Sequence, residues 1–275
     1  MEKLPLHKHS IWEQLDSPFR NAAEVPAVLE ELSITFDPDL LVEITTEYIT
    51  HQMSLYQVTF AAFPHLLATC ESAEDRDFRL QALLDITVMF AEYGGDAEME
   101  AIFLNSQCKL DRVNEIKTAF KEAFKRLKAI VHSAENDILQ KDESERKYFL
   151  LALAVAYEIY PVAAILWRYH DNEEYECSCP HCDETFTLWN EADKLVIYKE
   201  DPVFTKTQQA YAIQPAALLP SCFSKTITAD KNYEWLSYYI HMLNITSLQK
   251  SIDYLFGKAN CPYCETEFDV FENIQ

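Results

Sequence analysis

Apolar residues recur at helical spacing through most of the first 170 positions of the chain. From Arg112 to Val131 one stripe holds Val113, Ile116, Phe120, Phe124, Leu127 and Ile130. A period of three to four residues places such side chains on one face of an amphipathic helix. By the same pattern we expect helices at 25–32, from Asp37 through Tyr48, at 54–70, from Asp75 to Tyr93 and, less regularly, at 97–110.

Start and stop signals accompany these segments. Asp37-Pro38 provides an N-cap residue followed by a proline at the first helical position, and Gly94-Gly95 ends the helix that begins near Asp75. Pro64 lies inside the segment 54–70, where loss of one backbone donor predicts a kink or a short break. Residues 1–24 are polar, contain two prolines and are expected to be extended.

The most apolar stretch runs from Tyr148 to Trp167, with Glu158 as its one charged residue. Its length would suffice to span a membrane. Glu158 near the middle, Pro161 and the five alanines instead favour two buried helices that separate at Pro161. We expect Glu158 to be capped or paired inside the core.

Consecutive helices that are apolar on more than one side must stack on their neighbours. The segments 61–67 and 159–166 share an aromatic-proline step before an aliphatic run. The first of them, preceded by Gln57-Val58-Thr59-Phe60, resembles the HEAT-like helical repeat proteins of bacteria, some of which are immunity or regulatory proteins. The resemblance covers about residues 37–170. It implies an α-solenoid and transfers no catalytic residue.

The pattern changes after Asp171, where β-branched and aromatic residues form short runs. We expect strands at 175–179, 185–189 and 195–198, mostly loop at 201–230, a helix at 231–243 and a second helix from Asn244 or Thr246 to Phe256-Gly257. The predicted fold is mainly α: a HEAT-like helical repeat domain at 1–172 and a zinc-ribbon-like domain at 173–275, with a helical insertion at about 201–258.

Two matched cysteine hooks frame the second domain, C-P-H-C at 179–182 and C-P-Y-C at 261–264. Each is followed by acidic residues, a Thr and a Phe. Four thiolates that arrive as two C-x-x-C pairs match a tetrahedral structural zinc site. We therefore predict that Cys179, Cys182, Cys261 and Cys264 bind one structural Zn²⁺.

Neighbouring residues qualify this prediction. Cys177 and His181 are candidate exchange ligands, because each lies beside the first hook. The residue after the second cysteine of such a hook usually has a positive φ, which glycine adopts most easily. Asp183 and Glu265 occupy these two positions, and aspartate tolerates the conformation better than glutamate does.

The hooks also resemble the active-site motifs of thiol–disulfide oxidoreductases. In those proteins the first cysteine opens a long helix that lowers its pKa. Here the residues after Cys182 favour a strand instead. Four cysteine ligands also leave no open position on zinc for catalysis, and we assign no catalytic residue. A metal-dependent enzyme or a thiol–disulfide redox protein is kept as the alternative.

Composition narrows the function further. Gly94, Gly95 and Gly257 are the only glycines, so no P-loop, G-x-G-x-x-G or G-x-S-x-G motif is present. The formal net charge is −22, which argues against nucleic acid and anionic membranes and favours a basic partner protein. One basic stripe, Lys117, Lys121, Lys125 and Lys128, is expected to be a solvated helix face, with an anion site or an acidic-partner site as the alternative.

Met1 to Pro5 leads into no apolar signal segment. With eight cysteines, a reducing cytoplasm and metal thiolates fit better than disulfides, and Cys70, Cys108 and Cys222 are expected to be free thiols. The sequence thus predicts a cytoplasmic, non-enzymatic protein-binding module with structural zinc. It would be an acidic immunity or regulatory protein that binds a basic partner, and its oligomeric state is left open.

Overall fold

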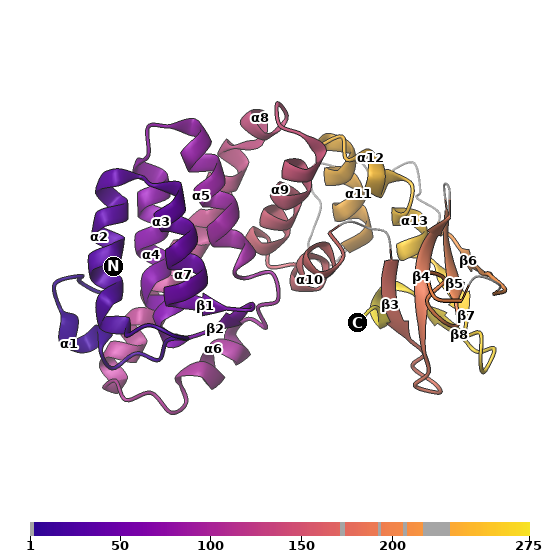
Figure 1. Ribbon diagram of the computed structural model, residues 1–275, viewed down its shortest axis with the longest axis horizontal. Coiled ribbons are helices and arrows are strands. Elements are labelled where there is room, and N and C mark those ends of the chain that lie inside the picture. The colour runs from indigo at the N-terminus through magenta and orange to yellow at the C-terminus, as the bar shows by residue number, and fades with distance from the viewer. Residues whose placement is uncertain (1–2, 171–173, 192–193, 206–207, 217–231) are drawn as a thin grey trace. The chain divides into compact units, whose positions relative to one another are not determined.

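The computed structural model describes residues 3–170, 174–191, 194–205, 208–216 and 232–275 (Figure 1). The chain divides into two compact units, Met1–Ala164 and Ile165–Gln275. The first unit is helical, and the second combines a curled six-stranded sheet with helices. The mainly α prediction is therefore confirmed. The predicted domain boundary at 172/173 lies outside the described residues.

The first unit follows the predicted order of helices closely. Its elements are α1 (His9–Trp12), α2 (Val25–Thr35), α3 (Pro38–Glu43), a π-helical turn (Ile44–Ile49), β1 (Thr50–His51), β2 (Ser54–Leu55), α4 (Gln57–Ser72), α5 (Arg76–Val88), α6 (Asp96–Phe103), α7 (Leu110–Ser133), α8 (Glu135–Ile138), α9 (Glu143–Ala156) and the start of α10 (Tyr160–Arg168).

Aspartate caps set the start of two helices as expected. The Asp37 carboxylate accepts a hydrogen bond from Asp39 N at the start of α3. The Asp75 carboxylate accepts from Asp77 N and Phe78 N at the start of α5. The predicted break at Pro64 does not occur, because α4 continues as one helix through it. Packing of α4 against α2, α5 and α7 compensates for the missing backbone hydrogen bond.

Five phenylalanines from three segments fill the centre of the first unit. Phe60 and Phe63 of α4 meet Phe120 and Phe124 of α7 and Phe90, which follows α5; all five are buried. The Phe60 and Phe120 ring centroids lie 4.9 Å apart, and those of Phe63 and Phe90 lie 5.1 Å apart. Edge-to-face contacts of this kind add to the free energy gained from burial. The cluster therefore joins helices that are distant in sequence.

Residues 1–24 were expected to be extended, and this is wrong where they form α1 and a 3₁₀ turn at Ala22–Glu24. Leu4, Trp12 and Leu15 are buried, and Trp12 Nε1 donates to the Pro5 carbonyl at 3.3 Å. A few large apolar residues among polar ones are enough to hold this segment on the helices, because one buried tryptophan removes a large area from water.

The apolar stretch 148–167 forms α9 and α10, as two helices were expected. The chain leaves the helix at 157–159, however, and Pro161 lies in the first turn of α10, where a proline fits without loss of a hydrogen bond. Glu158 is exposed with φ 59° at the end of α9, so its expected place in the core is wrong. Among the described residues, no helix combines the length and apolarity that a membrane crossing requires.

The basic stripe of α7 is also not simply solvated. Lys117 Nζ lies 2.6 Å from a Glu100 carboxylate oxygen, and Lys121 Nζ lies 2.8 Å from an Asp96 carboxylate oxygen. Lys128 Nζ lies 3.7 Å from the Tyr157 ring centroid. Three of the four lysines therefore contact groups of the first unit. This leaves little positive charge for an acidic partner.

The second unit is built on one antiparallel sheet in the order β3-β4-β5-β6-β7-β8 (Figure 1). Its elements are β3 (Glu174–Ser178), β4 (Thr185–Glu191), β5 (Lys194–Tyr198), β6 (Tyr211–Gln214), α11 (Asn232–Met242), α12 (Thr246–Gln249), α13 (Ile252–Leu255), β7 (Lys258–Asn260) and β8 (Glu267–Asp269).

The chain beyond β8 returns to the first strand of this sheet. Ile274 forms a β-bridge with Cys177, and Gln275 N donates to the Glu176 carbonyl at 3.0 Å. The Tyr169 hydroxyl donates to the Gln275 carbonyl at 2.8 Å. The two ends of the sheet are therefore connected, and the sheet curls around a shared core.

Three details differ from the sequence-based expectation. β6 lies in a segment predicted to be loop, whose part at 217–231 lies outside the described residues. The second predicted helix is divided into α12 and α13. The last α-helix ends at Leu255, before Gly257, and the glycine is needed because a Cβ atom there would lie 2.4 Å from the Gln214 carbonyl oxygen of β6.

Candidate metal centre

Each cysteine hook is the turn of an antiparallel hairpin. The first hook connects β3 to β4, and the second connects β7 to β8. Neither is followed by a helix as in the oxidoreductase motif, because Thr185-Phe186-Thr187 and Glu267-Phe268-Asp269 continue as strands. The strand predicted after Cys182 is confirmed.

Backbone hydrogen bonds fix the shape of the first hook. Cys179 N donates to the Glu184 carbonyl at 2.9 Å, and Asp183 N donates to the Cys179 carbonyl at 3.0 Å. His181 N lies 3.4 Å from Cys179 Sγ and points a donor at this sulfur. The backbone thus folds around Cys179 and directs the His181 N–H at its sulfur.

The second hook repeats this pattern. Cys261 N donates to the Thr266 carbonyl at 2.9 Å, Glu265 N donates to the Cys261 carbonyl at 2.9 Å, and Tyr263 N donates to Cys261 Sγ at 3.4 Å. The motif that is repeated in the sequence therefore corresponds to two turns with the same backbone geometry.

The expected positive φ is present in both turns. Asp183 has φ 59° and Glu265 has φ 60°. The left-handed region is unfavourable for a residue with a Cβ atom, so each hook carries some local strain. The repeated hydrogen bonds around the hooks hold the residues in this conformation.

The four hook sulfurs converge. The Sγ atoms of Cys179, Cys182, Cys261 and Cys264 all lie within 4.8 Å of one another. Cys179 Sγ is 3.7 Å from Cys264 Sγ, and Cys182 Sγ is 3.7 Å from Cys261 Sγ. A disulfide would need about 2.05 Å. A tetrahedron with Zn–S bonds of about 2.3 Å has edges of about 3.8 Å, so the group could hold one metal ion.

The four cysteines differ in exposure. Cys179 and Cys261 are each 1% exposed, Cys182 is half-buried and Cys264 is exposed. Cys264 Sγ lies 3.4 Å from Thr266 Oγ1. Hydrogen bonding from this hydroxyl, with a further backbone hydrogen bond from Thr266, lowers the pKa of Cys264 to about 6. Burial has the opposite effect on Cys261 and raises its pKa, so the four thiols do not share one protonation state without a bound cation.

The two candidate exchange ligands are not in the four-sulfur group. His181 is exposed at the tip of the first hook. Cys177 is fully buried on β3, and burial raises the pKa of its thiol to about 12, so it is protonated. The group of converging sulfurs therefore does not include Cys177.

The phenylalanine that follows each hook also has a structural role. Phe186 and Phe268 are buried, and their ring centroids lie 5.4 Å apart. Each comes four residues after the second cysteine of its hook. The repeated C-P-x-C-x-x-x-F pattern therefore joins the two hairpins twice, once through the sulfurs and once through the rings.

Sequence reasoning did not find two further supports of the centre. One is Thr266, which the sequence shows only as part of the repeated flank of the hooks, without a role at the sulfurs. The other is Lys199, whose Nζ lies 4.6 Å from the Tyr263 ring centroid while the Tyr263 hydroxyl donates to the Lys199 carbonyl at 3.2 Å. This contact spans 64 residues, and it fixes the exposed residue of the second hook against the end of β5.

Two further cysteines among the described residues are not part of the centre. Cys70 and Cys108 are buried free thiols of the first unit, and burial raises the pKa of both. Cys222 lies outside the described residues.

Comparison with protein-family models, with curated proteins and with solved structures gave no match to the chain. The chemistry of the centre therefore follows from its own geometry.

Proposed function

We propose that this chain is a non-enzymatic protein-binding module whose second unit is held together by a structural Zn²⁺ on Cys179, Cys182, Cys261 and Cys264. The observation that carries the proposal is the convergence of four sulfurs at the spacing of a tetrahedral thiolate site. Zinc is the usual ion in such a site, and the metal supplies folding free energy directly.

Three features favour a structural ion over redox or catalytic use. Four sulfur ligands leave no open coordination position. The closest sulfurs belong to different hooks, so the short contacts are not those of a C-x-x-C disulfide. Each hook continues as a strand, which leaves its cysteines without the helix N-terminus that activates an oxidoreductase thiol.

The binding role is supported by charge. With a net charge of −22, the protein attracts basic partners over long range and repels acidic ones. We propose a helical stack of the HEAT-like type as the platform and an immunity or regulatory role in the cytoplasm, where thiolates remain reduced. The partner would be a basic protein.

Metal and thiol analysis of the purified chain tests this function. We expect one zinc per chain and four thiols that react with a thiol reagent only after a chelator is added. A reversible disulfide between Cys179 and Cys182, with no bound metal, would support the redox alternative instead. For the partner, binding at low salt should be lost at about 0.5 M salt, where screening acts within about 5 Å.

A further inference from the structure

A groove with an apolar floor lies on the first unit. Its volume is about 370 Å³, and its floor is formed by Phe36 and Pro38 at the α2–α3 connection and by Phe78, Leu80 and Leu84 of α5. The Phe36 ring packs edge-on against the Phe78 ring, with centroids 5.6 Å apart. This volume is in the range of pockets that accept one or two side chains or a small molecule.

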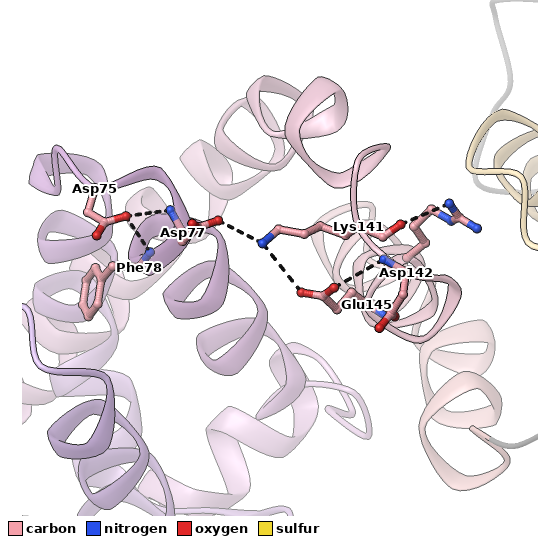
Figure 2. Close-up of polar contacts among 7 residues, drawn as sticks. Asp75, Asp77, Phe78, Lys141, Asp142 and Glu145 are labelled. Atoms are coloured by element: carbon pink, nitrogen blue, oxygen red, sulfur yellow. Dashed lines mark hydrogen bonds and ion pairs between the residues drawn. The ribbon is translucent and has the colours of Figure 1, made fainter.

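The rim of the groove carries a cation between two carboxylates. Lys141 Nζ lies 2.9 Å from an Asp77 oxygen and 3.9 Å from a Glu145 oxygen (Figure 2). The hydrogen bond to Asp77 raises the pKa of Lys141. The protein therefore already places one alkylammonium group between the carboxylates of this rim.

The carboxylates of the rim differ in their backbone hydrogen bonds and in their exposure. Asp75 caps α5 through Asp77 N and Phe78 N, and one Glu145 oxygen accepts from Asp142 N as part of the α9 capping box (Figure 2). The Asp77 side chain is 83% exposed. Asp77 is therefore the carboxylate that a ligand in the groove reaches most easily, although the ligand must displace Lys141 from it.

The chain around the groove adds negative charge. From Asn21 to Asp75 the sequence contains no Lys or Arg, while α2, α3 and the following turn carry Glu30, Glu31, Asp37, Asp39, Glu43 and Glu47. Of these carboxylates, Glu43 pairs with Arg20 at 3.5 Å, and Arg76 and Arg79 follow on α5, but acidic side chains still outnumber basic ones in this part of the chain. A cationic ligand is favoured there, and an acidic one is repelled.

From these observations we infer that the groove docks a basic segment of a partner protein, with an aromatic or aliphatic side chain on the Phe36–Phe78 floor and a neighbouring Lys or Arg at Asp77. The inference rests on the proposed binding function and gives it a location. Lys141 competes with the incoming cation, so it weakens binding and selects against segments that carry too little charge.

Random twelve-residue peptides displayed on phage, selected at low salt on the full zinc-loaded chain, provide the probe. We expect the selected peptides to combine Lys or Arg with an aromatic or aliphatic residue. The best peptide is then synthesised, and its Kd is measured by fluorescence anisotropy. Asp77→Asn should weaken binding about 3- to 10-fold, and Lys141→Met should tighten it about 3-fold, as expected for loss or gain of one unpaired charge near a surface.

Phe36→Gly tests the apolar floor and should weaken binding about 10-fold or more, as for an anchoring aromatic contact. Phe36 has φ 51°, a conformation that glycine adopts without strain, so the backbone is retained. Matched controls come from the second unit, where Lys258 Nζ lies 3.9 Å from an Asp269 oxygen. Lys258→Met and Asp269→Asn make the same charge changes and should leave Kd unchanged.

The outcomes distinguish failure of the inferred groove from failure of the proposed binding function. Basic peptides whose Kd is insensitive to Asp77→Asn and Phe36→Gly would overturn the groove, while binding of basic partners elsewhere would stand. Selected peptides without enrichment in Lys or Arg would overturn both. Weaker binding in Lys141→Met would overturn the competing role of Lys141. Melting temperatures within about 2 °C of the parent chain establish that each variant is folded.

Discussion

The sulfur atoms of Cys179 and Cys264 lie 3.7 Å apart, although 85 positions separate the two residues in the chain. Each belongs to a different hairpin turn, and the second short contact, Cys182 to Cys261, also crosses between the hairpins. An ion bound here would therefore connect the first strands of the second unit to its last ones, and would close a long loop that contains β5, β6 and α11 to α13.

Removing one sulfur should release this connection. We expect Cys261→Ser to lose the bound metal and to destabilise the second unit by on the order of 5 kcal/mol, because the free energy of metal binding is part of its folding free energy. Thermal unfolding followed by circular dichroism, with zinc present, measures the change. Cys108→Ser removes a buried thiol of the first unit and should have a much smaller effect. Equal melting curves for the two variants would contradict a metal centre.

Gly257 is predicted to be irreplaceable for a reason unrelated to its φ angle. An added Cβ atom would lie 2.4 Å from the Gln214 carbonyl oxygen, which is backbone and cannot move aside. We expect Gly257→Ala to destabilise the second unit by about 2–3 kcal/mol, as for an overpacked position. In the matched control Gly94→Ala, the new Cβ meets only the flexible Glu98 side chain at 3.2 Å. A loss in Gly94→Ala as large as that in Gly257→Ala would argue against this packing.

Asp85 gives the first unit a pH dependence. Burial raises the pKa of Asp85 from 3.8 to about 6, and its Oδ2 atom is buried without a hydrogen-bond partner among the described residues. Because the pKa of Asp85 is higher in the folded chain, the protonated carboxyl contributes its full stabilisation below pH 3.8. This contribution is lost as the pH rises through about 6. The full difference corresponds to at most about 3 kcal/mol.

The Asp85→Asn variant tests this dependence. It retains an acceptor for Gln81, whose Nε2 donates to Asp85 Oδ1 at 2.8 Å. We expect it to raise the free energy of unfolding at pH 7.5 by about 1–2 kcal/mol and to change little at pH 4. Urea titrations at the two pH values measure the difference. A gain of the same size at both would show that ionisation is not the cause.

His65 gives the stability of the first unit the opposite dependence on pH. Burial lowers the pKa of His65 from 6.5 to about 4, and its Nε2 atom lies 2.9 Å from the Leu4 carbonyl oxygen, to which the neutral ring donates. The unfolded chain therefore binds a proton between pH 6.5 and 4 that the folded chain excludes. Stability is complete above pH 6.5 and falls by up to about 3 kcal/mol as the pH drops to 4. His65→Gln should reduce this acid sensitivity in the same urea titrations, whereas an unchanged pH profile would contradict it.

Local sequence signals predicted much of this fold. Asp37 and Asp75 mark helix starts that the structure confirms, and the hook motif identified four cysteines that converge. Asp183 and Glu265 were recognisable as positions of positive φ, and both have it. These features depend on a few neighbouring residues, so a single sequence carries enough information about them.

The features that sequence reasoning missed depend on distant contacts. Trp12 is buried in a segment whose average composition is polar. Lys117 is paired with Glu100 of another helix, which no local pattern indicates. Glu158 was expected in the core because its neighbours are apolar, yet the end of α9 turns it outward. In each case packing between elements decided the outcome.

The metal itself provides the most direct test of the central proposal. Zinc stoichiometry and X-ray absorption at the zinc edge, both measured on the purified chain, report how many ions are bound and by which atoms. We predict one zinc per chain with four sulfur neighbours at about 2.3 Å. A chain that binds no metal under reducing conditions, or a zinc with fewer than four sulfur ligands, would contradict the proposed centre.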